Sequence, residues 1–314
     1  MRKVNTSFFV LTNNMRAVLL QIVFAMALFS FGAHAARTDA IVGLLSTRSS
    51  TYDGEYRTAV DVRDLLLRFG AKKVVMIDYN AIMKALGDGA SQDAVTDRVE
   101  KLLLKHKVDR IFIPGDYYNI SSPPLPPVPH RQMVTNSLVD IIRRRHDLRL
   151  LAICGGLQGV LHAQNVQISR IDQILNSPEM AESHSVSVLH PRELGASLTR
   201  AEAIAGSKLA EIVAGVKGTE KGRAALKFYL PDMHSEGINI SKSNMSRLHE
   251  LGYTISAVAD DGIIEGLEDD RGNMLLQMHP EFLLVNMDEK VGHNDEVDLS
   301  IEIAAKIIEY FLSR

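Results

Sequence analysis

The chain has 314 residues, of which 46% are hydrophobic, and a formal net charge of −3. This length is enough for one large core or two small ones, and without a basic excess nucleic-acid binding has no electrostatic support. The single cysteine excludes an intramolecular disulfide and any metal site built from several cysteines.

The first 35 residues have the composition of a secretory signal peptide. Arg16 precedes an apolar stretch over residues 17–31, and the segment ends in Ala33, His34 and Ala35, a small-x-small cleavage pattern. The apolar stretch has about 15 residues, fewer than the ~20 that span a bilayer. We therefore expect cleavage after Ala35 rather than retention as an anchor. The mature protein is predicted to be exported, periplasmic or secreted, with no membrane span.

Beyond the leader, short apolar runs alternate with segments of helical periodicity. Strands are predicted over residues 41–45, 73–78, 110–114 and 149–153, and helices over residues 59–69, 92–106 and 131–145. Such alternation is typical of a parallel sheet with helices on both faces. We therefore predict an α/β fold of three layers around a central, mostly parallel, flavodoxin-like sheet.

The second half of the chain is less regular. Residues 165–222 are polar apart from a predicted helix over residues 207–214, and we interpret them as an insertion that covers or borders a site. Strands are then predicted over residues 227–230, 254–259, 263–267 and 273–278, with a hairpin turn at residues 260–262 and a final helix over residues 297–312. These strands predict an antiparallel cluster at the C-terminal end of the fold.

One predicted strand runs directly into the cysteine. Ala152 and Gly156 stand two residues before and after Cys154 and leave room for a tight strand-to-helix turn. Such a turn strains its central residue and presents it at the carboxyl edge of the sheet. The N-terminus of the following helix would favour the reactive thiolate. A free cysteine is more commonly a small buried hydrophobic residue, so the turn alone does not show whether Cys154 is a nucleophile.

A base for this thiol follows the last predicted strand. His279 and Glu281 flank Pro280, and in an extended segment residues at this spacing point to the same side. A carboxylate beside an imidazole is the arrangement that orients a catalytic base. Taken alone, the His-Pro-Glu sequence is equally compatible with an ordinary loop.

Nucleophilic attack also requires backbone N–H groups that stabilise an oxyanion. We predict them at Gly155, which follows the cysteine, and at Gly115 and Asp116, in a turn that ends another strand. Both strands end at the carboxyl edge, where open α/β sheets bind their ligands.

The cysteine turn, the strand-end glycine turn and the Gln-Met-His-Pro-Glu ending together resemble the class I glutamine amidotransferase superfamily. The closer likeness is to its stand-alone γ-glutamyl hydrolases, the peptidase C26 group, over roughly residues 40–312. The resemblance implies a catalytic domain over residues 36–314 with a triad of Cys154, His279 and Glu281. It also implies that Gln158, His234 and Ser235 bind the glutamyl group.

Three departures from the family pattern surround the substrate rather than the triad. Asp116 replaces the second glycine of Pro-Gly-Gly, Glu236 replaces a glutamine, and residues 165–168 replace a Gly-Gly-Thr-Leu stretch. The Asp116 carboxylate would disfavour an oxyanion unless it turns away. Two alternatives stay open: a non-catalytic member that binds a γ-glutamyl ligand or a protein partner, and a glutaminase or amidotransferase that acts on glutamine.

We therefore predict a cysteine-dependent hydrolase of γ-glutamyl amide bonds whose partner is a small γ-glutamyl substrate. We expect no nucleic acid, no cofactor and no metal. His184 and His190, near Glu182 and Glu193, lack a recognised metal-ligand spacing. The sequence indicates no oligomeric state.

Overall fold

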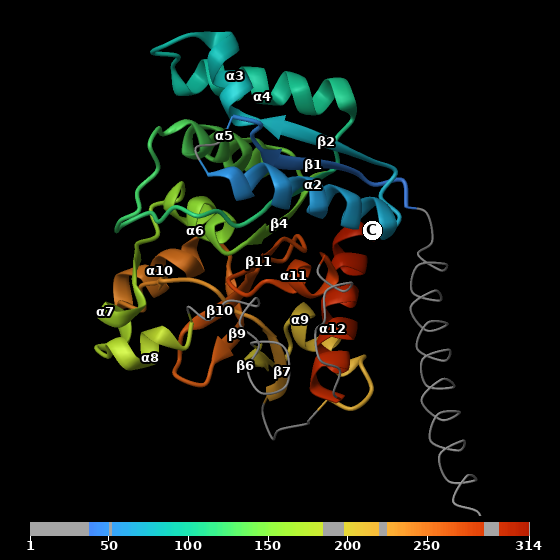
Figure 1. Cartoon of the computed structure of the whole chain (residues 1–314), viewed down its shortest axis with the longest axis vertical. Helices are drawn as coiled ribbons and strands as arrows, with labels where there is room; N and C mark the ends of the chain where they lie inside the picture. Colours follow the sequence, from blue (N-terminus) through green and yellow to red (C-terminus); the bar gives the residue numbers. More distant parts are fainter. Residues whose placement is uncertain (1–37, 50–51, 185–197, 220–224, 286–294, 314) are drawn as a thin grey trace, which may run out of the picture.

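The computed structural model describes residues 38–49, 52–184, 198–219, 225–285 and 295–313 (Figure 1). The predicted leader, residues 1–35, lies outside this description. Within the described residues, no helix is both long and apolar enough to cross a membrane.

One half of a nine-stranded sheet is parallel. Its strands lie in the order β2 (Lys73–Asp78), β1 (Ile41–Ser46), β3 (Arg110–Ile113), β4 (Arg149–Ile153) and β11 (Met274–Leu276). The order 2-1-3-4 followed by the last strand is that of flavodoxin-like sheets. The predicted α/β class and parallel sheet are confirmed.

The other half of the same sheet is antiparallel. Beyond β11 it continues through β10 (Ile264–Glu268), β9 (Thr254–Ala259), β6 (Leu198–Ile204) and β7 (Ala225–Pro231), each antiparallel to its neighbour. This half confirms the predicted C-terminal antiparallel cluster. A separate small sheet pairs β5 (Ile168–Arg170) with β8 (Glu236–Ile238).

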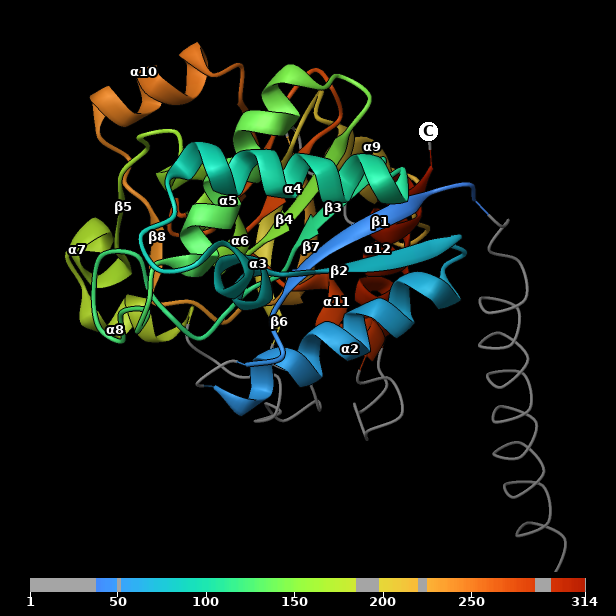
Figure 2. The ribbon, with the colours of Figure 1, turned by 90° about the horizontal axis from the view of Figure 1, so that it is seen from above.

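Helices cover both faces of the large sheet, as Figure 2 shows from above. One core contains residues of α2 (Asp53–Arg68), α9 (Lys208–Ala214), α11 (Pro280–Val285) and α12 (Asp295–Leu312). The other contains residues of α3 (Tyr79–Leu86), α4 (Gln92–His106), α5 (His130–Arg144), α6 (Gly155–His162) and α10 (Lys242–Glu250). Leu44 and Leu45 of β1 point to opposite cores, as the two-residue period of a strand requires.

The interpretation of residues 165–222 as irregular is wrong in part. This stretch contains β5 and β6, and the short helices α7 (Ile171–Leu175) and α8 (Pro178–Glu182). β6 joins the large sheet although its buried positions include the small side chains of Ala201 and Ala203. Because alanine adds little hydrophobic signal between polar neighbours, the alternation was too weak to predict a strand.

Candidate active site

Cys154 lies at a sharp turn between β4 and α6. Its backbone has φ 50° and ψ −113°, a strained conformation for a residue with a side chain. Its N–H donates to the carbonyl of Leu276 at 2.7 Å, which ties the turn to the end of β11. The cysteine therefore stands at the carboxyl edge of two adjacent parallel strands, as predicted for a nucleophile.

Two glycines leave the turn the room it needs. A Cβ on Gly156 would lie 2.2 Å from the carbonyl oxygen of Ile113, so no side chain fits without moving β3. A Cβ on Gly115 would lie 3.4 Å from Cβ of Cys154 and 3.0 Å from Cε1 of His279. The cysteine and the imidazole thus both border the space above Gly115.

His279 and Glu281 form a buried pair, with Nδ1 of the ring 2.7 Å from Oε1 of the carboxylate. The predicted pairing is present, but its predicted geometry is wrong. Pro280 begins α11, so Glu281 lies in the first turn of a helix rather than in an extended segment. Proline suits the first helical position because its missing N–H has no intrahelical partner there.

The environment of His279 favours its charged form. Burial alone would lower the pKa of His279, but the negative charges of Glu281 and Cys154 outweigh it and raise the pKa to about 10. The ring of Phe282 stacks on the imidazole at a centroid distance of 4.1 Å and fixes its plane. The site therefore favours the imidazolium form of His279 at neutral pH.

A cavity of about 330 Å³ brings together the residues predicted from the sequence. Its lining includes the three predicted catalytic residues, the three predicted oxyanion residues and the three predicted substrate-binding residues: Cys154, His279, Glu281, Gly115, Asp116, Gly155, Gln158, His234 and Ser235. The backbone nitrogen of Asp116 lies 3.1 Å from a Cβ built on Gly155. The backbones of these two predicted oxyanion donors are thus adjacent.

The Asp116 carboxylate also lies close to Gly155, with Oδ2 3.1 Å from the same built Cβ, but protein groups pair with both of its oxygens. Its Oδ2 pairs with Nε of Arg131 at 2.7 Å, and its Oδ1 accepts from the N–H of Tyr118. Burial raises the pKa of Asp116, although the Arg131 charge opposes this shift. Arg131 also contacts Glu55 at 3.1 Å and donates to the Pro114 carbonyl, so one guanidinium serves two carboxylates.

Glu236 turns away from the cavity. Its carboxylate accepts hydrogen bonds from the N–H groups of Ile120 and Ser121 and from the hydroxyls of Ser121 and Ser122, at 2.6–3.2 Å. The residue clamps the loop that follows β3 onto β8. Its replacement of a glutamine therefore has a structural reason.

The residues predicted to bind substrate differ in what their side chains contact. The Gln158 amide donates to the backbone carbonyl of Glu236 at 2.8 Å. The two ring nitrogens of His234 face that same carbonyl and the carboxylate of Asp232. Ser235 donates to Asn119 at 3.2 Å and is partly exposed at the cavity. Gln158 and His234 thus hold the cavity wall, and Ser235 faces the open space.

Sequence reasoning missed a second group of polar side chains beside the cavity. His184, Asp232, His234 and Glu265 lie together and are all buried. Burial would lower the pKa of His184, but Asp232 and Asp261 raise it to about 9. Because its members are up to 81 positions apart (265 minus 184), no local motif marks the group. His190 and Glu193, once considered with His184, lie outside the described residues.

Comparison with known proteins gives likenesses of fold only. No protein-family model matches the chain, and no curated protein matches it. Among solved structures 69 chains match. One is a glutamine amidotransferase from Methylobacillus flagellatus, 12% identical over 88% of this chain and 92% of that chain, with a TM-score of 0.43. Another is SMU.1228c, 9% identical over 85% of this chain and 97% of that chain, with a TM-score of 0.46.

Proposed function

We propose that the chain hydrolyses γ-glutamyl amide bonds through a thioester on Cys154. The observation that carries the proposal is the strained cysteine turn at a cavity that His279 and Glu281 also line. The raised pKa of His279 supports its proposed role as the proton donor to the leaving amine.

The proposed reaction has two steps. The Cys154 thiolate attacks the γ-carbonyl carbon, the C–N bond breaks, and His279 gives its proton to the leaving amine. His279 then takes a proton from water, the water oxygen attacks the thioester carbon, and the C–S bond breaks to release the γ-carboxyl product. The N–H groups of Gly155 and Asp116 would stabilise the oxyanion in both steps.

Two contacts argue against a non-catalytic role. The carboxylates of Asp116 and Glu236 favoured that alternative from the sequence, and in the structure Asp116 pairs with Arg131 and Glu236 accepts from Ser121. The positive charge of Arg131 offsets part of the negative charge that Asp116 brings near the proposed oxyanion.

The rim of the cavity favours a leaving group larger than ammonia. Tyr52 and Tyr117 line the cavity, are 41% and 56% exposed, and stack at a centroid distance of 4.8 Å. Exposed aromatic faces bind apolar and flat groups. This observation supports a γ-glutamyl peptide or γ-glutamyl amine as substrate over free glutamine.

The test combines covalent labelling with turnover. We expect a glutamine-like diazoketone to add one mass increment to the wild-type chain and none to Cys154→Ala, because the thiolate is the group alkylated. We also expect turnover of γ-glutamyl anilides and peptides that Cys154→Ala loses. Absence of an adduct at saturating reagent, with the fold intact by circular dichroism, would instead indicate a binding protein. Turnover of glutamine alone would indicate a glutaminase.

A further inference from the structure

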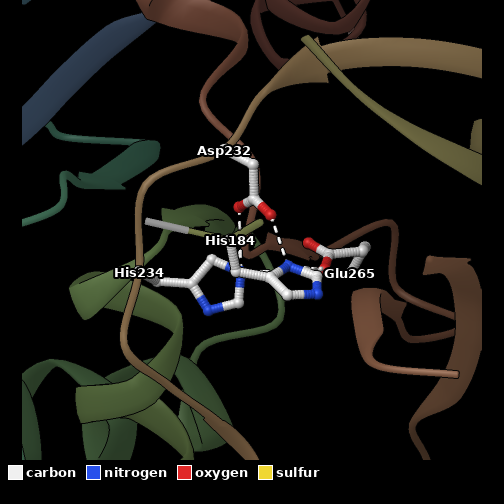
Figure 3. Close-up of side chains that lie close together, drawn as sticks. All are labelled: His184, Asp232, His234 and Glu265. Carbon is white, nitrogen blue, oxygen red and sulfur yellow. Dashed lines mark hydrogen bonds and ion pairs between the residues drawn. The ribbon is translucent and has the colours of Figure 1, made fainter. Parts of the chain in front are cut away.

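Four buried side chains from three segments converge on one point (Figure 3). His184 follows α8, Asp232 and His234 follow β7, and Glu265 lies on β10. Each offers a nitrogen or oxygen atom, and these atoms all lie within 4.8 Å of one another. The four residues are between 0% and 6% exposed, so the group is closed to solvent.

The outer contacts of the two imidazoles fix which nitrogen faces the centre. Nδ1 of His234 lies 2.8 Å from the backbone carbonyl of Glu236, which only accepts, so this nitrogen carries the proton. Nε2 of His184 lies 2.8 Å from the Asp261 carboxylate, which likewise accepts. The inner nitrogens, His234 Nε2 and His184 Nδ1, face Asp232 at 2.8 and 2.6 Å, and loss of their protons on metal binding would leave their lone pairs directed inward. Metal-binding histidines are oriented in this way by a carbonyl or carboxylate behind them.

The surroundings of Glu265 are a second observation that favours a bound cation. Its carboxylate oxygen stands 3.5 Å from Nδ1 of His184 and 3.7 Å from Nε2 of His234, beyond normal hydrogen-bond length. Neither of its oxygens has a hydrogen-bond partner in the part of the chain that the structure describes. Burial and the negative charge of Asp232 raise the pKa of Glu265 although both imidazoles oppose this shift, so a cation among the four side chains would offset the cost of burying its carboxylate.

The dimensions of the group fit a tetrahedral zinc ion. Ligand atoms about 2.0–2.1 Å from zinc stand about 3.3 Å apart in a tetrahedron. The nitrogen–oxygen distances to Oε1 of Glu265, 3.5 and 3.7 Å, lie near this value. Those to Oδ2 and Oδ1 of Asp232, 2.6 and 2.8 Å, are hydrogen-bond lengths that would lengthen when an ion replaces the protons. Two imidazoles and two carboxylates match the ligands that zinc accepts, whereas calcium and magnesium prefer oxygen alone.

We propose that His184, Asp232, His234 and Glu265 bind one zinc ion in a structural site. With four protein ligands the site has no open position for substrate. It would fix the backbone between Asp232 and His234, whose intervening Met233 carbonyl lies 3.7 Å from Sγ of Cys154. The preceding carbonyl of Pro231 accepts from the N–H of His279 at 2.8 Å. The ion would thus hold the segment that contacts both proposed catalytic residues.

The test measures metal content and stability, independently of any amidase activity. The full chain is purified with zinc, dialysed against metal-free buffer, and analysed by inductively coupled plasma mass spectrometry. We expect about one zinc per chain. Removal by a chelator should lower the thermal midpoint, and added Zn²⁺, but not Mg²⁺ or Ca²⁺, should restore it.

Matched variants locate the ion. Glu265→Gln keeps the shape of the side chain and removes its charge, and His234→Ala removes a nitrogen ligand; we expect both to lose zinc. Asp261→Asn should weaken zinc binding by roughly 10–100-fold, because it only orients His184. Cys154→Ala should retain one zinc, since the thiol is not a proposed ligand.

Two results would overturn the proposal. One is wild-type chain that holds no zinc after purification with the metal and whose thermal midpoint does not rise when zinc is added. The other is zinc retained by Glu265→Gln and His234→Ala but lost by Cys154→Ala, which would place the ion among Cys154, His279 and Glu281. If a variant fails to fold, the zinc content and thermal midpoint of the wild-type chain still test the proposal.

Discussion

The His279–Glu281 pair sets the proton balance of the candidate site. A pKa raised from 6.5 to about 10 means that the folded protein holds the proton on His279 more tightly than the unfolded chain does. The resulting stabilisation is fully present below pH ~6.5 and is lost as pH rises through about 10. The free energy of unfolding contributed by this group should therefore fall over that window.

We predict that Glu281→Gln lowers the pKa of His279, because it removes the largest charge that raises it while burial continues to lower it. The variant should also lose roughly 10²–10⁴-fold in kcat/KM at neutral pH, the usual contribution of a positioned acid–base group. Nuclear magnetic resonance titration of ¹³C-labelled histidine Cε1 measures the pKa directly.

The control for this experiment is Glu309→Gln, which removes an exposed carboxylate of α12 that pairs with Lys306. It should leave the His279 titration unchanged. A wild-type His279 that titrates at or below its ordinary pKa would contradict the expected charge state.

For single residues, the sequence predicted which residues lie at the candidate site better than it predicted how their side chains are oriented. Cys154, His279 and Glu281 were found because each sits beside a local signal, a strand end, a glycine or a proline. The inward-facing ring of His234 and the Asp116–Arg131 pair could not be found, because both depend on packing between distant segments. The direction of a side chain at such positions depends on tertiary contacts, which the periodicity of the sequence does not indicate.

Among the elements, α5 carries two arginines in opposite environments. Arg131, near its start, pairs with Glu55 and Asp116 and is largely buried, whereas Arg144, at its end, pairs with Glu100 and Asp140 at the surface. A buried ion pair broken on one side leaves an uncompensated charge, but an exposed pair is screened by water.

We predict that Arg131→Met destabilises the fold by about 3–5 kcal/mol, because it leaves two buried carboxylates without their cation. It should also lower activity, since the negative charge of Asp116 near the proposed oxyanion site would lose the compensating charge of Arg131. Arg144→Met, on the same helix, should change stability little. Urea denaturation of the two variants measures the difference, and equal losses would contradict the assigned role of Arg131.

Regular elements with strong local patterns were predictable, and those without them were not. α4 was predicted with its observed bounds because apolar positions recur at helical spacing and Ser91 caps its start. α10 was missed because it buries only Asn244 and Leu248, although Ser241 caps it in the same way. α11 was missed because its six residues follow a proline and are too few to show a period.

At the scale of the whole molecule, the candidate site lies where the two halves of the sheet meet. Cys154 follows β4 and His279 follows β11, the last parallel strands, while Glu265 lies on β10, the first antiparallel one. The order of the predicted strands, helices and turns in each half of the chain predicted whether its strands are parallel or antiparallel. Their union into one sheet was not predictable, because it depends on β11 pairing in parallel with β4, a strand distant in the sequence, while it also pairs antiparallel with β10.

We further propose that the chain is exported, and we predict cleavage after Ala35. When it is expressed in a bacterium with an intact secretion pathway, the mature N-terminus should be Ala36, because signal peptidase requires small residues at the positions of Ala33 and Ala35. N-terminal sequencing of the exported protein measures this. Ala35→Tyr should block processing, whereas an uncleaved wild-type chain would indicate a retained anchor.

The single cysteine has a chemical consequence outside the cell. If Cys154 is oxidised to a sulfenic acid, the chain contains no second thiol that could condense with it as an intramolecular disulfide. The sulfenic acid can then be trapped reversibly by a small-molecule thiol, a partner thiol or a backbone nitrogen, and without such trapping further oxidation gives the irreversible sulfinic acid. For the exported enzyme that we propose, the redox state of the surroundings would then set the lifetime of the activity.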